Sequence, residues 1–412
     1  MTAVYPLRGV RPRPELASSV ASPPYDVLDS DEAREMAGGN PRSFLHVIKP
    51  EIDLAHGIDP HDDSVYARGV ENLDRFIADG VLVQDGEPRL YAYAQRMGDH
   101  RQLGLMACVS VDEYEQGLIK KHEFTRPDKE ADRTRHIVQA RAQNGPVFLA
   151  YRASDGTRTA MESLTTGEPV VDFVADDGIQ HTLWVIGDDA RVAGVAAAFG
   201  ELPALYIADG HHRSASALNA RDQLRAANPG HSGDEPYNRF LAVIFPDDQL
   251  KILAYNRAVA DLGGLSSEAF LERAAERFEV GEMDDPVPDR TACFGCYLDG
   301  RWVRLTARPG TYDESDPVAR IDAAILQANL LAPVLGIADP RTDERIKFVG
   351  GIRGTDELER LVDGGAFRVA FSLFPTSMAQ LFDVADAGQV MPPKSTWFEP
   401  KLRSGMVVHL IR

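Results

Sequence analysis

The sequence predicts a mixed α/β protein, of the α/β class with α+β character, on three observations. Hydrophobic residues make up 44% and charged residues 26% of the 412 residues, as in a globular chain with a substantial core. Strand-like apolar runs alternate with helical patterns, which favours α/β over all-β structure. The length exceeds the size at which single cores stop growing, so two or three domains are expected.

The chain begins with an irregular segment that a longer helix follows. Proline is dense in the first 60 residues, and this density excludes long helices there. One short helix is predicted to open at Ser30, because Asp31 and Glu32 in its first turn complement the helix dipole. Residues 62–79 carry apolar side chains on one helical face, and Gly80 ends that helix.

Periodicity predicts the remaining elements in the same way. The apolar pattern over 318–336 is the most helical in the chain, and a helix-rich stretch starts near Ser266. We place domain boundaries near residues 150 and 260, which gives segments 1–150, 151–260 and 261–412. The predicted strands span 89–96, 103–111, 181–186, 204–208, 240–245, 251–255, 367–375 and 406–411, and the other predicted helices span 189–198 and 213–226.

The formal net charge of −19 argues against two classes of partner. An acidic surface repels nucleic-acid phosphates and anionic membranes at long range, so we expect neither nucleic acid nor a membrane as a partner. No apolar stretch reaches the roughly 20 residues of a membrane span, and the N-terminus lacks the apolar core of a signal peptide, which predicts a cytoplasmic protein. Cys108, Cys293 and Cys296 are too few for a disulfide framework, and we interpret the last two as packing residues. The oligomeric state stays open.

The strongest functional signal is the run Asp209-Gly210-His211-His212-Arg213. An apolar strand (204–208) leads into it and an amphipathic helix follows it. Amides at a helix N-terminus and the helix dipole both favour a phosphate there, Gly210 permits close approach, and the Arg213 fork matches phosphate oxygens. The alternative is a capping aspartate with solvated histidines, but ligands of α/β sheets bind at this edge, so we predict a phosphate site.

The segment 120–136 is the second candidate site. It contains His122 and Glu123 among many cations in an otherwise acidic chain. Phosphoryl transfer needs positioning, neutralisation of charge, usually with Mg²⁺, and a carboxylate that orients or deprotonates the attacking hydroxyl. We predict Glu123 as that carboxylate, with Asp209 as its competitor or as the metal ligand. The alternative is a solvated helix with ion pairs. The cations are Lys120, Lys121, Arg126, Lys129, Arg133 and Arg135.

Three familiar site patterns are excluded, and a loop near the C-terminus is the third candidate site. Arg126 stands where a zinc-protease HExxH motif needs its second histidine, and neither a Walker A loop nor GxGxxG occurs. Near the C-terminus, a proline-held loop joins Lys394, Ser395 and Thr396, residue types that bind phosphate. A structural loop around a packed Trp397 is an equal alternative.

The DGHHR run after an apolar strand resembles the phosphate-binding turn of the ParB/sulfiredoxin-like fold. The wider chain is similar to a prokaryotic family catalogued as domain of unknown function 1015 and related to free-serine kinases. The resemblance rests on five further segments that extend over nearly the whole chain. They are Pro23-Pro24-Tyr25-Asp26-Val27, residues 40–46 (NPRSFLH), His122-Glu123 with Asp132-Arg133, residues 145–148 (GPVF) and residues 392–398 (PPKSTWF).

The resemblance implies a ParB/sulfiredoxin-like nucleotide-binding core with additional α/β domains. His211 stands where sulfiredoxins carry their cysteine, so sulfinic-acid reduction is excluded, and the acidic charge argues against a DNA-binding ParB role. What remains implied is phosphotransfer from ATP or ADP, with Mg²⁺, to a small hydroxy amino acid, most simply serine. The implied roles are catalysis for Glu123, Asp209 and His122, phosphate binding for Gly210, His211, His212, Arg213, Lys394, Ser395 and Thr396, and substrate binding for Tyr25, Asp26, His46 and Arg133.

Two other functions stay open at this point. A ParB-like module would bind nucleotide without turnover and switch a partner interaction. A phosphate-ester hydrolase would use His211 or His212 as a general acid and need no nucleotide.

Overall fold

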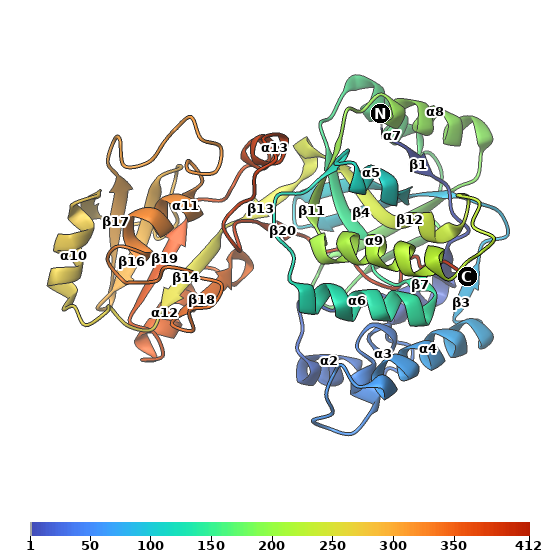
Figure 1. Ribbon diagram of the computed structural model, residues 1–412, viewed down its shortest axis with the longest axis horizontal. Coiled ribbons are helices and arrows are strands. Elements are labelled where there is room, and N and C mark those ends of the chain that lie inside the picture. The colour runs from blue at the N-terminus through green and yellow to red at the C-terminus, as the bar shows by residue number, and fades with distance from the viewer. Residues whose placement is uncertain (1) are drawn as a thin grey trace. The chain divides into compact units, whose positions relative to one another are not determined.

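The computed structural model describes residues 2–412, which form two compact units (Figure 1). Unit 1 comprises the chain up to Leu250 together with Pro400–Arg412, and unit 2 comprises Lys251–Glu399. Both units mix helices and strands, which confirms the predicted fold class. The boundary that we predict near 150 falls inside strand β8 (Val147–Tyr151), which lies within the sheet of unit 1.

Unit 1 is built on a nine-stranded sheet. Its strands run in the order β6-β11-β8-β12-β5-β4-β10-β9, and β1 pairs with β5. β11 is parallel to β6 and β12 is parallel to β8, whereas the other neighbours are antiparallel. The strands besides β8 are β1 (Val4–Tyr5), β4 (Leu90–Met97), β5 (His100–Ser110), β6 (Ile119–Lys120), β9 (Val171–Val174), β10 (Gln180–Ile186), β11 (Leu205–Asp209) and β12 (Arg239–Pro246).

The helices of unit 1 pack in two groups. Helix α6 (Pro127–Ala140) lies along α9 (His211–Ala226), and α4 (Asp63–Ala78) packs against α6 (Figure 1). Helix α7 (Asp155–Ser163) packs against α8 (Asp189–Gly200). Pro127 opens α6 at a position where its missing N–H costs nothing. The short helix predicted at Ser30 is α2 (Ser30–Ala37), which Asp29 and Glu32 close in a reciprocal capping box.

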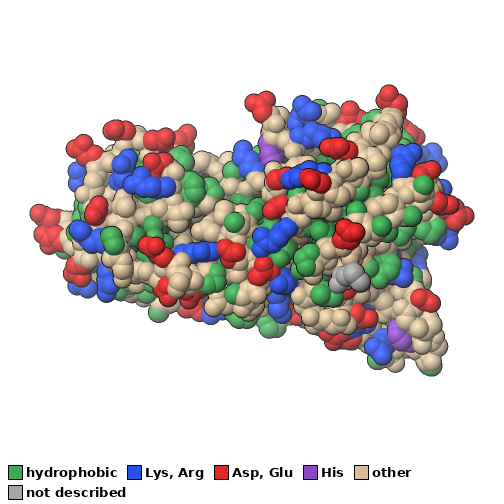
Figure 2. All heavy atoms as spheres, turned by 90° about the horizontal axis from the view of Figure 1, so that it is seen from above, with side chains coloured by type: hydrophobic (Ala, Val, Ile, Leu, Met, Phe, Trp, Pro, Cys, Tyr) green, Lys and Arg blue, Asp and Glu red, His purple; other side chains and the backbone are tan. Residues whose placement is uncertain are grey.

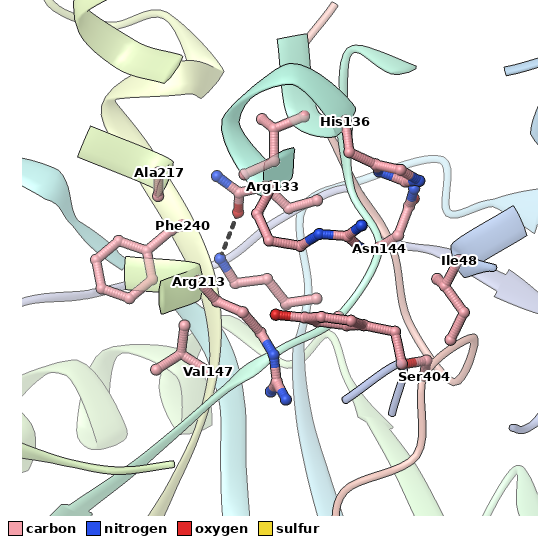
Figure 3. Close-up of a pocket in the computed structure, with 14 residues that line it drawn as sticks. Ile48, Arg133, His136, Asn144, Val147, Arg213, Ala217, Phe240 and Ser404 are labelled. Atoms are coloured by element: carbon pink, nitrogen blue, oxygen red, sulfur yellow. Dashed lines mark hydrogen bonds between the residues drawn. The ribbon is translucent and has the colours of Figure 1, made fainter. Parts of the chain in front are cut away.

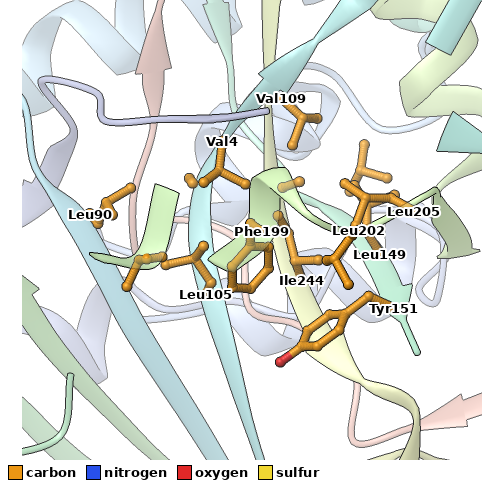
Figure 4. Packing of buried hydrophobic residues seen from close by; sticks show 14 of the residues in the cluster. Val4, Leu90, Leu105, Val109, Leu149, Tyr151, Phe199, Leu202, Leu205 and Ile244 are labelled. Carbon is orange, nitrogen blue, oxygen red and sulfur yellow. The ribbon is translucent and has the colours of Figure 1, made fainter. Parts of the chain in front are cut away.

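The larger hydrophobic core of unit 1 lies between the sheet and helices α7 and α8 (Figure 4). On β5, alternate residues from Leu103 to Val109 belong to it, which is the two-residue period of a strand with one face against helices. Phe199 of α8 is fully buried and contacts the ring of Tyr151 at 5.0 Å between centroids. The core therefore holds α7 and α8 against this face of the sheet. The DGHHR run begins at the end of one of its strands, β11.

The last residues of the chain return to unit 1. Strand β21 (His409–Leu410) pairs with β7 (Ala142–Gln143), and Val408 bridges to Val10. The strand predicted over 406–411 is therefore limited to two residues. The other short elements are β2 (Val10–Pro12) paired with β3 (Leu82–Gln84), helices α1 (Ala17–Val20), α3 (Leu45–Ile48) and α5 (Val111–Glu115), and 3-10 turns at Pro14–Leu16, Pro50–Asp53, Pro236–Asn238 and Asp247–Gln249.

Unit 2 has its own antiparallel sheet, in the order β15-β17-β16-β19-β14-β18. Helix α12 (Asp356–Asp363) covers it with Leu358 and Leu361, which pack in one cluster with Ala258 and Ala370. The strands are β14 (Tyr255–Val259), β15 (Phe278–Glu282), β16 (Cys293–Leu298), β17 (Arg301–Ala307), β18 (Ile346–Gly350) and β19 (Val369–Leu373), with β13 (Lys251–Leu253) paired to β20 (Trp397–Glu399) and further helices α10 (Ser267–Ala275) and α13 (Met378–Asp386).

The continuous helix predicted over 318–336 is wrong. The structure has only α11 (Asp322–Leu326), which runs into a π-helical turn at Gln327–Leu331. There the amide of Ala332 donates to the carbonyl of Gln327, five residues earlier, at 3.0 Å. Pro333 lacks an N–H and its ring crowds the carbonyl four residues before it, so the wider turn relieves a clash that an α-helix would keep.

The surface and the helices carry two further findings. Lys, Arg, Asp and Glu side chains are interspersed over the face seen in Figure 2, without a single large basic patch. None of the helices in residues 2–412 has the length and apolar character that a bilayer crossing requires.

Candidate functional site

The DGHHR run forms a strand, a tight turn and a helix, as predicted. Strand β11 ends at Asp209, Gly210 adopts the left-handed region with φ +100°, and α9 begins at His211. A side chain at Gly210 would be strained by about 1–2 kcal/mol, which explains the glycine. No side chain caps α9, so its first amides face the turn as donors for an anion.

Asp209 pairs with a lysine from the end of the chain. Its Oδ2 lies 3.1 Å from Nζ of Lys401, in the segment that returns to unit 1. Burial alone would raise the pKa of Asp209, but the charges of Lys401 and Arg213 outweigh it and lower that pKa below its ordinary value. Asp209 is therefore an ionised carboxylate at the turn. Local sequence patterns do not predict the contact with Lys401, because 192 positions separate the two residues.

His211 brings the second predicted segment to the turn. Its Nε2 accepts from the backbone N–H of His122 at 3.4 Å, and its Nδ1 lies 3.8 Å from Oε2 of Glu123. An accepting Nε2 places the ring proton on Nδ1, so the N–H faces the carboxylate. The rings of His122 and His211 meet edge to face, 4.5 Å apart. Glu123 therefore lies close enough to the DGHHR turn for both to belong to one site.

Both histidines of this pair are neutral at pH 7. Burial lowers the pKa of His122 to about 4. Burial, with a smaller contribution from His122, lowers the pKa of His211 well below its ordinary value. The contact between Nδ1 of His211 and Glu123 is therefore between an uncharged donor and a carboxylate, and no ion pair forms. His211 therefore faces Glu123 without neutralising it.

His212 holds the same segment at a second point. Its Nε2 accepts from the backbone N–H of Arg126 at 3.0 Å, and Arg126 precedes the first residue of α6. The two adjacent histidines thus bind the backbone at both ends of residues 122–126. The segment that sequence analysis treats as a separate candidate is fixed to the DGHHR turn by these two bonds.

Arg213 ties the N-terminal motif to the turn. It is 9% exposed, its Nη1 donates to the carbonyl of Pro146 at 2.7 Å, and its Nη2 donates to Oδ2 of Asp26 at 3.0 Å. Burial would lower the pKa of Arg213, but Asp26 and Asp209 outweigh it and raise that pKa. Two nitrogens of the guanidinium already have protein partners, whereas Nε has none, and the role of Arg213 in phosphate binding stays a prediction.

A small cavity adjoins this arginine (Figure 3). Its volume is about 50 Å³, and Arg133 and Arg213 reach it from α6 and α9. The ring of Tyr25 lies 4.2 Å from the guanidinium carbon of Arg133 and 5.7 Å from that of Arg213, and burial raises the pKa of Tyr25 to about 12. The lining residues are Tyr25, Ile48, Arg133, His136, Ile137, Gln143, Asn144, Gly145, Val147, Arg213, Ala217, Phe240, Leu241 and Ser404.

Several cavity residues escaped sequence analysis. Gln143 and Asn144 precede the GPVF segment, which was noted only as part of a resemblance. Both polar atoms of the Gln143 side chain have partners within the protein. Its Oε1 accepts from the amide of Leu241 at 2.7 Å, and its Nε2 donates to the carbonyl of Arg239 at 3.1 Å. An amide residue in a short loop is common, so only the fold distinguishes Asn144 from an ordinary turn residue.

His46 does not line the cavity. Its Nδ1 lies 2.6 Å from Oδ1 of Asp53, and its Nε2 lies 3.1 Å from the carbonyl of Asn40. The hydrogen bond with Asp53 raises the pKa of His46 above its ordinary value. Asn72 also donates to Asp53, at 2.7 Å. This network accounts for His46 without a ligand, and its predicted role in substrate binding stays a prediction.

The loop with Lys394, Ser395 and Thr396 belongs to unit 2. The Ser395 hydroxyl donates to the carbonyl of Pro392 at 2.7 Å, and the carbonyl of Ser395 accepts from the Thr376 hydroxyl at 2.9 Å. The carbonyl of Lys394 accepts from Arg257 at 3.1 Å. These bonds shape the loop from within unit 2, and its proposed phosphate role stays a prediction.

Carboxylates suited to a divalent cation are few near the turn. Residues 2–412 contain no cluster of three or more His, Cys, Asp or Glu side chains that could hold a metal ion. Mg²⁺, however, is commonly held by one or two carboxylates while phosphates and water supply the other ligands. Asp209 and Glu123, the carboxylates beside His211, could supply such a pair of protein ligands for Mg²⁺. They do not form a metal site made of protein ligands alone.

Residues 4–324 match the family described as "Protein of unknown function (DUF1015)". The chain belongs to this family. The DUF1015 match contains the DGHHR turn, Glu123 and the cavity residues from Tyr25 to Leu241, whereas the loop at 392–398 lies beyond it. The relation of DUF1015 to the ParB/sulfiredoxin-like fold stays a prediction from the motif.

Three solved structures are similar to this DUF1015 chain at low sequence identity, and no curated protein matches it. A conserved hypothetical protein from Pyrococcus furiosus is 14% identical, with 73% of this chain and 93% of that chain covered and a TM-score of 0.36. A free serine kinase in complex with AMP is 13% identical, with 71% and 86% covered and a TM-score of 0.36. SbnI with a C-terminal truncation, from Staphylococcus aureus, is 10% identical, with 73% and 85% covered and a TM-score of 0.39.

Acidification is expected to destabilise unit 1 through its buried histidines. Burial holds the pKa of His122 and of His136 at about 4 in the folded chain, against 6.5 as the ordinary value. The unfolded chain therefore binds protons first, so the stability present above pH 6.5 is lost as the pH falls toward 4, by about 1.4 kcal/mol per pH unit for each histidine.

Urea unfolding at a series of pH values checks this expectation. His136→Gln should reduce the loss of unfolding free energy between pH 6.5 and 5 by about 2 kcal/mol, because one titrating group is removed. His56→Gln is the matched control, since His56 is 74% exposed. Equal pH dependence in the wild type and His136→Gln would contradict the assignment.

Proposed function

We propose that this chain is a nucleotide-dependent phosphotransferase that acts on a small hydroxy amino acid, with the conversion of free L-serine to O-phosphoserine as the first candidate. One observation carries the proposal. The Glu123 carboxyl group lies 3.8 Å from Nδ1 of neutral His211, at the uncapped start of a helix. A base and an anion site thus stand side by side, which is the minimum that phosphoryl transfer requires.

The residues divide the work as follows. The first amides of α9 and the helix dipole hold the phosphates of the nucleotide. Glu123 accepts the hydroxyl proton, as the hydroxyl oxygen forms its bond to phosphorus and the bond between phosphorus and the nucleotide oxygen breaks. His211 supplies a neutral neighbour for Glu123, with 3.8 Å between Nδ1 and Oε2. When bound, Mg²⁺ would neutralise charge on the transferred group, and Asp209 is the carboxylate placed to hold it.

Two further features support a phosphotransferase. Lys401 and Arg213 balance the charges of Asp209 and Asp26 beside the turn, which reduces the repulsion of an anionic ligand in a chain whose net charge is −19. The choice of nucleotide and serine rests on the resemblance of the DGHHR run and its companion segments to the free-serine kinases, and it is the part of the proposal that an experiment must establish.

Phosphorus NMR tests the proposal. The full chain is mixed with Mg²⁺, ATP or ADP and a pool of small hydroxy compounds that includes serine, and a new phosphate ester is expected. Nucleotide binding without any ester would favour the regulatory module, and release of phosphate from an ester without nucleotide would favour the hydrolase. Either result would replace the phosphotransferase.

A further inference from the structure

Asn144 is the least satisfied polar side chain at the cavity of Figure 3. It is only 5% exposed, and within residues 2–412 neither its Nδ2 nor its Oδ1 has a hydrogen-bond partner. Nε of Arg213, which also lines the cavity, is buried without a partner. Buried polar groups are ordinarily paired, and a molecule in the cavity is the nearest source of the missing bonds.

The size of the cavity limits its guest. A volume of about 50 Å³ exceeds the roughly 10–15 Å³ that one water molecule needs, so the cavity has room for more than a single water. A nucleotide is far larger. The guest is therefore a small molecule, or else a few water molecules.

The charges and hydrogen-bonding groups of the lining residues indicate which kind of molecule fits the cavity. Arg133 pairs with Asp132 and Arg213 pairs with Asp26, so the charges of the walls are balanced. Nε of Arg213 and Nδ2 of Asn144 are hydrogen-bond donors without an acceptor, and a carboxylate can accept from both. Oδ1 of Asn144 is an acceptor without a donor. The complementary molecule carries a carboxylate and, close to it, an N–H or O–H group.

We propose that this cavity binds a small carboxylate with an amino or hydroxyl group on its α-carbon. The carboxylate accepts from Nε of Arg213 and Nδ2 of Asn144, and the α-substituent donates to Oδ1 of Asn144. The claim that this cavity is the subsite of the phosphoryl acceptor rests on the proposed function. The claim that it binds such a carboxylate does not depend on that function. Asn144 is then the residue that selects the α-substituent.

Calorimetric titration of the full chain without nucleotide or Mg²⁺ tests binding separately from turnover. L-serine, L-alanine and L-lactate are expected to bind. Propionate lacks the α-donor and ethanolamine lacks the carboxylate, so each should bind at least about tenfold more weakly. Binding of none of the five would show that the cavity holds water only, and equal binding of propionate and alanine would remove the role of Asn144.

A glycine in the wall allows the cavity to be filled. A Cβ at Gly145 would lie 3.6 Å from Oγ of Ser404 and 3.9 Å from Cδ of Arg213, ordinary contacts that need no rearrangement. Gly145→Ala is expected to weaken L-serine at least about tenfold, by removing room for the guest, without lowering the unfolding temperature. Gly156→Ala is the matched control, because a Cβ there meets only Oγ of Ser154, at 3.9 Å.

A second variant separates packing from recognition. Asn144→Asp keeps the size of the side chain and places a like charge beside the carboxylate, so serine binding should be lost. Serine binding without phosphotransfer would overturn the proposed function and leave the cavity site intact. Phosphotransfer with an unchanged KM for serine in both Gly145→Ala and Asn144→Asp would overturn the cavity site and leave the proposed function intact.

Discussion

Replacing Glu123 by glutamine is expected to lower kcat for phosphotransfer by about 10²- to 10⁴-fold, the usual contribution of a general acid or base. Glutamine has the same shape and keeps the contact with Nδ1 of His211, which lies 3.8 Å from the Glu123 carboxyl group. The segment held by His211 and His212 should therefore stay in place. Steady-state kinetics should show the fall in kcat, while nucleotide affinity by calorimetry and the unfolding temperature remain those of the wild type.

The control for this change is a glutamate remote from the turn. Glu162 is exposed on α7, so Glu162→Gln should leave kcat unchanged. If kcat of Glu123→Gln stays within about threefold of the wild type, Glu123 is not the base, since general-base catalysis contributes far more. Asp209→Asn would then be the variant to measure.

Replacing Arg213 by alanine is expected to destabilise unit 1 by about 1–3 kcal/mol, the usual cost of leaving a buried acceptor, here the carbonyl of Pro146, without its hydrogen bond. Arg213 is 9% exposed and donates to Asp26 and to the carbonyl of Pro146. Without it, both acceptors lose their donor and Asp209 loses a neighbouring positive charge. Urea unfolding of the full chain should show the loss in the transition of unit 1.

A double-mutant cycle separates the ion pair from the packing of the side chain. Arg213→Ala and Asp26→Asn should be less than additive, with a coupling of about 1–3 kcal/mol. Arg158→Ala is the matched control, because Arg158 is 48% exposed and pairs with Asp155 and Asp248, so about 1 kcal/mol or less is expected. A cost for Arg213→Ala as small as that of Arg158→Ala would show that Arg213 is held for a ligand instead.

Local patterns explain which parts of the site were predictable from the sequence. The strand, the Asp-Gly turn and the helix around His211 follow from fewer than 25 consecutive residues, in which periodicity and turn chemistry agree. Glu123 was predicted as the base because of its neighbours, and the structure places it beside the turn. Its catalytic role itself stays a prediction.

The missed parts depend on contacts between distant residues. Asp26 reaches Arg213 over 187 positions, and periodicity carries no information about such pairs. For that reason sequence analysis assigned Arg213 to a phosphate, whereas the fold supplies it with a carboxylate. Asn144 shows the same limit, because its unsatisfied amide is evident only once the cavity walls are assembled. The π-turn at Gln327–Leu331 was missed because apolar spacing predicted a helix and Pro333 was not weighed against it.

The return of Pro400–Arg412 to unit 1 has a consequence for the growing chain on the ribosome. Asp209 is made long before Lys401, and all of unit 2 must be synthesised between Leu250 and Pro400. At about 5–20 residues per second this interval lasts roughly 7 to 30 s. For that time the nascent first unit lacks β21 and the cation that Asp209 requires. We expect it to remain open to chaperones and inactive until Pro400–Arg412 have been synthesised.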